Sequence, residues 1–302
     1  MIIVTGASGA FGRAAAERLM ELVPANQLIL TSRTPAKLGD LAARGAKVRF
    51  ADFDRPETLD EAFAGGTKML LISTARVGSR VGQHKNAIDR AVAAGVRHIV
   101  YTSIIGAAEA ANPALVKRDH RATEELIEAS GAAWTFLRDS QYAEAIAGAV
   151  TPGALANGRL PDNAHDGQIA FVSRDDCVAC AAGVLSQDGH ENQTYDITGP
   201  ELLTFPKAMA IASEITGKPI DVIPVDDEQM FAHFDSLGIP RVASDDVPDG
   251  PIPWSSDDMV TFGQSIREGF FNKLTDHVER ITGRKPKPLR EVMLAYRDTW
   301  PV

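Results

Sequence analysis

Hydrophobic residues recur along the first 140 residues with two alternating periods. Short runs rich in β-branched residues are separated by longer alanine-rich stretches, in which apolar positions recur every three to four residues. The short runs are residues 2–4, 28–30, 48–50, 69–72, 99–101 and 134–137. The alanine-rich stretches include residues 11–22, 81–94 and 114–129. This alternation predicts a Rossmann-type doubly wound α/β fold, a parallel sheet with helices on both faces.

The regular alternation weakens after Tyr142. Pro-Gly and Asn-Gly pairs at 152–153 and 157–158 predict loops, and a helix at 175–185 and a strand at 194–197 follow. We therefore expect a dinucleotide-binding domain over residues 1–153, with segments near 168–200 returning to it. Residues 154–302 are expected to form a smaller α/β cap that binds substrate.

Composition narrows the class of protein. The chain has 302 residues, 44% of them apolar and 24% charged, with a net charge of −9. An acidic chain is a poor candidate for binding nucleic acid through its phosphates. No apolar run approaches the ~18 residues of a membrane helix, and the N-terminus lacks the basic region of a signal peptide. We expect a cytoplasmic protein, and the sequence leaves a homodimer open.

A glycine-rich turn directly follows the first predicted strand. Residues 5–12 read TGASGAFG, and an amphipathic stretch comes next. Gly6 suits a tight turn, Gly9 lets backbone approach a pyrophosphate, and Gly12 allows close packing of helix and strand. A helix N-terminus offers free N–H groups and a favourable dipole to an anion. This context predicts a dinucleotide site rather than a turn without a ligand.

The end of the second predicted strand distinguishes between the nicotinamide cofactors. An acidic residue there would bind the ribose hydroxyls of NAD. The chain instead has Arg33 at this point, after Ser32 and one turn before Lys37. A guanidinium suits a 2′-phosphate, with Ser32 and Lys37 as helpers, so NADP(H) is the expected cofactor. The alternative for Arg33 is a solvated surface side chain.

The acid of a ketone reductase is missing from this chain. Such enzymes on this scaffold protonate an alkoxide with a tyrosine that is activated by a lysine four residues later. None of the four tyrosines has a lysine at that spacing; they are Tyr101, Tyr142, Tyr195 and Tyr296. A quinone gives a delocalised anion that water or a weak donor protonates, whereas a ketone gives a strongly basic alkoxide that needs a positioned acid.

Several motifs together resemble one family. They are TGASGAFG at 5–12, ADFD at 51–54, LLIST at 70–74, GQHKNAIDRAVAAGVRHIVYTS at 82–103, FLRDSQYAE at 136–144 and TDHVERITGRKPKPLRE at 275–291. This set is similar to the NmrA-like atypical short-chain dehydrogenases, in particular to the branch of the NAD(P)H:quinone oxidoreductases of type 2 and the triphenylmethane reductases. The resemblance spans nearly the whole chain. The RDSQY segment departs from the amide-rich aromatic run of that group.

The resemblance implies which residues would contact each part of the cofactor. Arg33 would hold the 2′-phosphate, Asp52 and Phe53 would flank adenine, and Ser73 and Thr74 would line the ribose and nicotinamide. An ordinary strand end is the alternative for Asp52 and Phe53. The residues that would hold the pyrophosphate are Gly6, Ser8, Gly9, Ala10 and Phe11.

The resemblance also implies three catalytic candidates. Ser103 stands where a short-chain dehydrogenase has its hydroxyl, or is a helix cap or turn residue. His120 would point at the cofactor as a donor that titrates near neutrality, with Glu124 one helical turn later to orient it; the alternative is a partly exposed helical histidine. Tyr142 would reach the substrate cleft, or else pack in the core of the cap.

The expected activity is NADPH-dependent hydride transfer to a quinone or similar conjugated aromatic acceptor. An NADP-binding redox sensor without turnover is the alternative, and an ether or enone reductase is a third option. The CxxC pair, Cys177 and Cys180, lies in a predicted helix beside two aspartates that disfavour a thiolate. No second pair completes a zinc set, so we expect no metal site.

Overall fold

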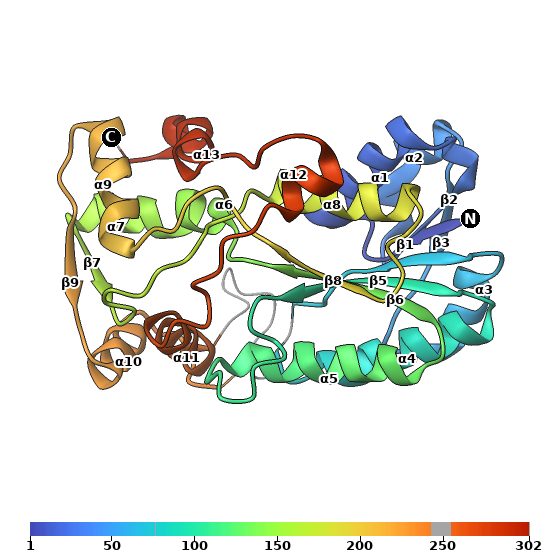
Figure 1. Ribbon diagram of the computed structural model, residues 1–302, viewed down its shortest axis with the longest axis horizontal. Coiled ribbons are helices and arrows are strands. Elements are labelled where there is room, and N and C mark those ends of the chain that lie inside the picture. Colours follow the sequence, from blue (N-terminus) through green and yellow to red (C-terminus); the bar gives the residue numbers. More distant parts are fainter. Residues whose placement is uncertain (76, 243–254, 302) are drawn as a thin grey trace.

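Seven parallel strands form the central sheet of the computed structural model, which describes residues 1–75, 77–242 and 255–301 (Figure 1). Their order across the sheet is β3-β2-β1-β4-β5-β6-β8. The strands are β1 (Ile2–Val4), β2 (Leu28–Ser32), β3 (Lys47–Phe50), β4 (Lys68–Leu71), β5 (His98–Ile104), β6 (Ala133–Asp139) and β8 (Gln193–Ile197). The predicted Rossmann-type sheet is confirmed.

Helices cover both faces of the sheet (Figure 1). One face packs against α1 (Ala10–Leu22), α8 (Arg174–Ser186) and α12 (His277–Thr282). The other face packs against α3 (Leu59–Phe63), α4 (Arg80–Ala93) and α5 (Leu115–Ala129). A short helix, α2 (Gly39–Ala43), lies between β2 and β3.

Successive residues of a strand point to opposite faces of the sheet, so their apolar side chains pack in two separate cores. In β5, Val100 joins the core under α1 and α8, whereas Ile99 and Tyr101 join the core under α3, α4 and α5. All three side chains are fully buried. A strand buried on both faces needs apolar residues at successive positions, which explains the continuous apolar runs in the sequence.

The sheet reverses its direction of winding between β1 and β4. Strands β2 and β3 continue from β1 on one side, and β4, β5 and β6 continue on the other. Val4 lies in register with Leu30 of β2 and with Leu70 of β4, so the carboxyl ends of the three strands lie side by side. Ligands of doubly wound sheets bind at this switch point.

The C-terminal region has its own small sheet and its own apolar core. Two parallel strands, β7 (Arg159–Asp162) and β9 (Asp221–Pro224), pair with each other. The helices of this region are α6 (Ala143–Ala145), α7 (Thr151–Asn157), α9 (Phe205–Thr216), α10 (Asp227–Ser236), α11 (Ser256–Arg267) and α13 (Leu289–Tyr296). Apolar side chains of α6, α7, α9, α11 and α13 meet in a third cluster, which also includes Phe171 and Phe271 from connecting segments. A domain boundary at residue 153 stays a prediction.

The expected loop around Pro152 is wrong. Ile146–Val150 form one π-helical turn that joins α6 to α7. Proline lacks an N–H and its ring crowds the carbonyl four residues earlier, so a regular α-helix would break here. The wider π turn accommodates the proline within one continuous helix. Gly158 then ends the helix at φ 66°, as a C-terminal glycine commonly does.

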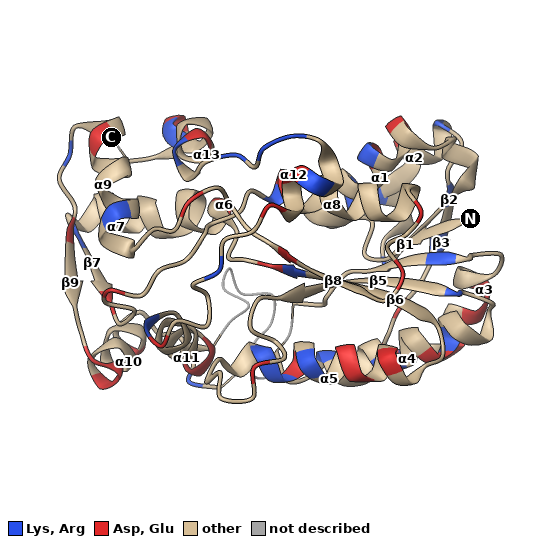
Figure 2. Ribbon diagram, in the orientation of Figure 1, with Lys and Arg blue, Asp and Glu red and all other residues tan. Residues whose placement is uncertain are grey.

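Charges of both signs lie along α4 and α5 (Figure 2). Lys85 pairs with Asp89, and Arg121 pairs with Glu125, each one helical turn apart. Such exposed pairs contribute little stability and mark the solvent side of the helix. Among the helices described, none is both long and apolar enough to cross a membrane.

Candidate cofactor and active site

The glycine turn between β1 and α1 has the shape that the motif predicts. Gly6 has a φ of 57°, in the left-handed region that favours glycine. A Cβ on Gly12 would lie 2.4 Å from the carbonyl oxygen of Gly6, so no other residue fits there. Gly9 donates its N–H to that same oxygen at 2.9 Å. The turn therefore presses the start of α1 close to the end of β1.

The N-terminus of α1 keeps its first N–H groups available. Its N-cap residue, Gly9, has no side chain to accept a hydrogen bond from them, so the backbone donors at Ala10 and Phe11 face the switch point. The Ser8 hydroxyl does not cap the helix and lies 2.6 Å from the Ser32 hydroxyl instead. An anion bound here would meet backbone N–H groups and the positive end of the helix dipole.

A cluster of hydroxyls connects the turn to the end of β2. Thr34 donates its hydroxyl to Ser8 at 3.2 Å and its backbone N–H to Ser32 Oγ at 2.9 Å. Thr34 was not among the predicted site residues, although it belongs to the same Ser-Arg-Thr run as Ser32 and Arg33. Arg33 and Lys37 are exposed, and across residues 1–75, 77–242 and 255–301 neither forms an ion pair. Positive charge is therefore available beside three hydroxyls.

Arg13 is less available to a ligand than Arg33. It pairs with Asp40 and Glu17 and donates to the Lys37 carbonyl at 3.2 Å. The Arg13–Asp40 contact raises the pKa of Arg13 and lowers the pKa of Asp40. Arg33 is thus the better placed of the two arginines for a phosphate.

The residues after β3 form a compact turn. Asp52 is half-buried and accepts the Asp54 N–H at 3.1 Å, while its own N–H donates to Thr58 Oγ1 at 3.1 Å. The Phe53 carbonyl accepts from Asn86 of α4 at 2.9 Å, and its ring packs against the core under α3 and α4. Both expected adenine neighbours lie at the carboxyl end of the sheet, and their role stays a prediction.

Side chains from neighbouring elements fix the backbone after β4. Ser73 donates its N–H to Thr102 Oγ1 at 2.9 Å. Thr74 donates its N–H to His84 Nε2 at 3.1 Å, and its hydroxyl is buried without a protein partner in the described part of the chain. A buried hydroxyl without a partner at a switch point is suited to a ligand, because leaving it unpaired costs free energy.

Ser103 and Glu124 belong to a buried ion-pair network. Ser103 donates its hydroxyl to Glu124 Oε1 at 2.7 Å. Arg138 of β6 holds the same carboxylate with two hydrogen bonds, at 2.9 and 2.8 Å, and Arg121 adds a third. The Ser103 hydroxyl is thus engaged on the α5 side of the sheet. Its catalytic role stays a prediction without geometric support.

His120 lies in different surroundings from those expected. Only 5% of the residue is exposed, Nε2 lies 3.0 Å from Arg80 Nη1, and Nδ1 lies 3.0 Å from the Tyr101 hydroxyl. Burial, with Arg80 and His84 nearby, lowers the pKa of His120 well below its ordinary value. The predicted titration near neutrality is therefore wrong, as is the predicted partnership with Glu124.

Tyr142 lies beside the glycine turn and donates to a buried carboxyl. Its hydroxyl donates to Asp139 Oδ2 at 2.9 Å, and its ring stacks on Phe11 of α1 with centroids 6.4 Å apart. Burial and the nearby Asp139 raise the pKa of Tyr142 well above its ordinary value. The Arg174 guanidinium lies 5.6 Å from the ring centroid. The tyrosine is at the correct edge of the sheet, but it is not an activated acid.

The CxxC cysteines are buried core residues. Cys177 and Cys180 are free thiols inside α8 with no exposed surface. Burial, with Asp139 nearby, raises the pKa of both thiols. Both groups therefore stay protonated, which removes the reactive thiolate.

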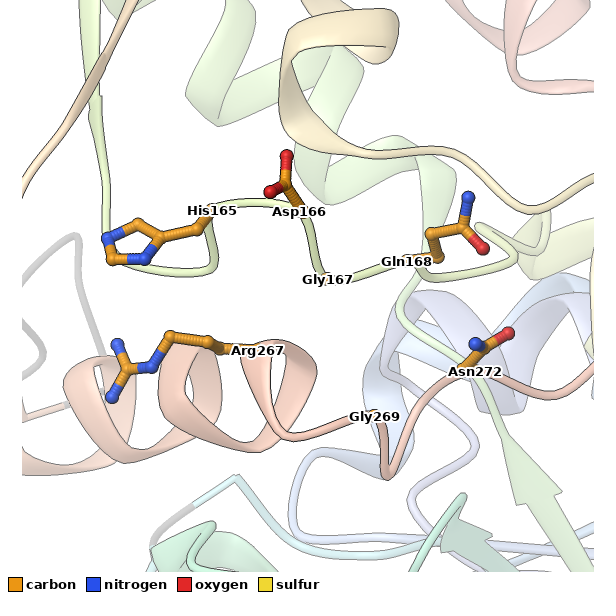
Figure 3. Close-up of a pocket in the computed structure, with 7 residues that line it drawn as sticks. All are labelled: His165, Asp166, Gly167, Gln168, Arg267, Gly269 and Asn272. Carbon is orange, nitrogen blue, oxygen red and sulfur yellow. The ribbon is translucent and has the colours of Figure 1, made fainter.

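A separate hollow of about 360 Å³ lies in the C-terminal region (Figure 3). One wall is the loop after β7 with His165, and the facing wall is the end of α11 with Arg267 (Figure 3). Arg267 holds Asp227 with two hydrogen bonds, at 2.9 and 3.0 Å, so its charge is neutralised. None of the residues that line the hollow is among the predicted site residues.

The fold and the turn together define the class of protein. A parallel sheet, a left-handed glycine turn at its switch point and an N-terminus of α1 without a side-chain cap are the features of a dinucleotide-binding α/β protein.

The comparisons with known proteins give the family. Residues 6–188 match the NAD(P)H-binding family, and the chain belongs to it. Quinone oxidoreductase 2 of Escherichia coli is 37% identical over 270 residues, which is 88% of this chain and 93% of that protein. The NAD(P)H azoreductase of Xenophilus azovorans is 30% identical, over 81% and 84% of the two chains.

Solved structures agree over almost the full length. The NADPH-dependent quinone oxidoreductase of E. coli in complex with NADPH superposes with a TM-score of 0.88 at 34% identity, over 98% of this chain and 99% of that one. The Citrobacter triphenylmethane reductase in complex with NADP(H) gives a TM-score of 0.85 at 31% identity, over 98% and 100%. The predicted family resemblance and the nicotinamide cofactor are confirmed.

Proposed function

We propose that this protein is an NADPH-dependent oxidoreductase that reduces a quinone or a similar conjugated aromatic acceptor. One combination of features carries the proposal. The structure has the glycine turn and the uncapped helix N-terminus of a dinucleotide site, and the pKa values of its buried tyrosines are not lowered. Similarity to quinone, azo-compound and triphenylmethane reductases supports the same class of acceptor.

The residues around the switch point fit NADPH. The N–H groups at the start of α1 would hold the pyrophosphate, with Gly6, Gly9 and Gly12 allowing the close approach. Arg33 would pair with the 2′-phosphate, assisted by Lys37 and the hydroxyls of Ser8, Ser32 and Thr34. Ser73 and Thr74 would meet the nicotinamide side, and Asp52 and Phe53 the adenine.

The tyrosines disfavour a simple ketone as the substrate. A ketone reductase needs a phenol that is made more acidic by a nearby cation. Here burial raises the pKa of Tyr101, Tyr142 and Tyr195. Because hydride addition to a quinone yields a delocalised anion, no strong acid is required for that reaction.

The protein's part in the reaction is to bind, align and exclude water. Bound NADPH supplies a hydride when it is oxidised. The α1 N-terminus and the segment after β4 would fix the cofactor's orientation at the switch point, and alignment of two reactants supplies much of the rate enhancement. A cytoplasmic location and a homodimer remain predictions from the sequence.

The test is the oxidation of NADPH by a panel of acceptors. The rate is measured as the loss of NADPH absorbance. Turnover is expected with benzoquinones, naphthoquinones and conjugated dyes, and much weaker turnover with unactivated ketones. NADPH binding is measured in parallel by fluorescence. A protein that binds NADPH but oxidises it with no acceptor would support a redox sensor and contradict this proposal.

A further inference from the structure

A buried polar network joins the segment after β4 to α5. Arg80, Asp119 and His120 are 5%, 8% and 5% exposed. Arg80 donates through Nη2 to the Ala75 carbonyl at 3.2 Å, and its Nε lies 3.6 Å from Asp119 Oδ2. That carboxylate oxygen accepts the Gly78 N–H at 2.6 Å. One arginine–aspartate pair thus fixes the backbone at residues 75 and 78.

The network defines the tautomer of His120. A guanidinium only donates hydrogen bonds, so Arg80 Nη1 donates to His120 Nε2 at 3.0 Å. The ring proton is therefore on Nδ1, which lies 3.0 Å from the Tyr101 hydroxyl oxygen and donates to it. His120 serves as a neutral acceptor that orients Arg80.

A second histidine fixes the start of the same segment. The Thr74 N–H donates to His84 Nε2 at 3.1 Å, so the proton of His84 is on Nδ1. This Nδ1 lies 2.8 Å from Thr123 Oγ1, which donates to the Asp119 carbonyl at 2.8 Å. Burial, with Arg80 nearby, lowers the pKa of His84 to about 3 and keeps the ring neutral.

Helix α11 holds the other end of the network. The N-cap residue of α5, Ala114, has no side-chain hydrogen bond to offer. The Leu115 N–H donates to Thr261 Oγ1 at 3.0 Å, and Thr261 belongs to α11. A cap of α5 thus comes from a helix far along the chain, and it holds the start of the helix that carries Asp119.

We propose that Arg80 is a positioning residue for the nicotinamide half of the cofactor, with His120 as its neutral hydrogen-bond acceptor. Arg80 holds the backbone at residue 75 directly and at residue 78 through Asp119, beside the switch point after β4. This inference rests on the proposed function. It also replaces the interpretation of His120 as a proton donor, since the imidazole acts through Arg80 and not on the acceptor.

The location of the segment after β4 gives different expectations for a residue that positions the nicotinamide ring and for one that only stabilises the fold. Residues 73–75 directly follow β4, the strand next to β1 at the switch point. The phosphates would be held elsewhere, at α1 and Arg33. A disturbed segment should therefore misalign the reacting ring while most of the binding contacts of NADPH persist, and a small misalignment costs rate more than affinity.

The first experiment compares Arg80→Gln with Arg284→Gln. Arg284 pairs with Asp176, which is fully buried, and with Asp175, so it is a control arginine whose carboxylate partners belong to α8 and not to α5. For Arg80→Gln we expect the single-turnover rate of NADPH oxidation by a quinone to fall by at least about tenfold. The Kd for NADPH should rise by less than about threefold. Equal rate losses in the two variants, or parallel losses of rate and affinity in Arg80→Gln, would overturn the proposal.

The second experiment uses two substitutions of His120. Glutamine can place Oε1 near the position of Nε2 and accept from Arg80, whereas phenylalanine fills the space without an acceptor. We expect His120→Gln to keep most of the wild-type rate and His120→Phe to behave like Arg80→Gln. A proton donor would give equal losses in both variants and a changed pH profile, and that outcome would contradict the assignment.

A third readout does not depend on turnover. The fluorescence of the nicotinamide ring in bound NADPH reports its surroundings directly. Arg80→Gln should change this emission at saturating NADPH, and Arg284→Gln should leave it as in the wild type. If the wild type binds NADPH without oxidising it, the proposed function fails while this signal still tests the positioning role. Unchanged emission in Arg80→Gln would refute that role.

Discussion

Asp139 is a carboxyl group whose surroundings oppose its charge. It is 4% exposed, at the end of β6. Its Oδ2 accepts from the Tyr142 hydroxyl, and its Oδ1 has no hydrogen-bond partner in the described part of the chain. Burial raises its pKa from 3.8 to about 7. The folded protein therefore retains a proton that the unfolded chain releases. Stability from this group is full below about pH 4 and is lost as pH rises towards about 7.

Asp139→Asn should remove this pH dependence. Each pH unit between the two pKa values costs the wild type up to about 1.4 kcal/mol. Relative to the wild type, the variant should therefore gain stability as pH rises from about 5 to about 8, because the amide stays neutral and still accepts from Tyr142. Denaturant unfolding at several pH values measures the difference. A difference that stays constant over this range would contradict the assignment.

Arg33 carries the prediction of cofactor preference. It is exposed, beside three hydroxyls at the end of β2. Arg33→Ala should weaken NADPH binding about ten- to a hundredfold through the loss of charge-assisted hydrogen bonds, with little effect on NADH. Arg44→Ala is the control, because Arg44 is also exposed but lies between α2 and the start of β3, away from the end of β2. Equal weakening for both cofactors would show that Arg33 does not contact the 2′-phosphate.

Single residues were predictable where a motif fixes the backbone, and less predictable where packing sets the environment. Gly6 and Gly12 have the expected geometry because the turn leaves no alternative. The surroundings of His120 depend on Arg80 from α4 and on Tyr101 from β5, and no local pattern reports how deeply these three side chains are buried. The same holds for Glu124, whose partner Arg138 comes from another strand.

At the scale of elements, the β1–turn–α1 unit should tolerate no side chain at Gly12. A Cβ there would lie 2.4 Å from the Gly6 oxygen and 2.9 Å from the Ala7 Cα. Gly12→Ala should displace the turn and weaken NADPH binding at least about tenfold, since the backbone donors lose their arrangement.

The matched control is Gly39→Ala. Gly39 is in the first turn of α2 at φ −59°, and a Cβ there meets nothing within 4 Å. This variant should bind NADPH like the wild type and be equally or slightly more stable, by up to about 1 kcal/mol. If both variants bind NADPH normally, the close packing at Gly12 is not required for the site.

Helices and strands with a clear hydrophobic periodicity were predicted well, and those that depend on tertiary contacts were not. The six N-terminal strands and the helices α1, α4 and α5 lie within a few residues of their expected ranges. The small β7–β9 sheet escaped prediction because its strands are short and carry few apolar residues. Pro152 signals a break, yet the π turn absorbs it, since neighbouring helices supply the packing that stabilises the irregular backbone.

At the scale of the whole molecule, distant segments converge on one edge of the sheet. Four features lie at, or support, the carboxyl ends of the strands: the glycine turn, the hydroxyls after β2, the segment after β4 and the cap that α11 gives to α5. The sequence predicted the first two from local motifs. The contribution of α11 could not be predicted, because it joins Leu115 to Thr261, 146 positions apart in the chain.

The central claim is direct hydride transfer from NADPH to a conjugated acceptor. The most direct measurement is a single turnover of the enzyme with NADPH that carries deuterium on one face of C4, with a benzoquinone as acceptor, for each face in turn. The account predicts that one label slows the oxidation and leaves the cofactor, while the other is retained. Oxidation that is insensitive to both labels, or no oxidation of bound NADPH, would contradict it.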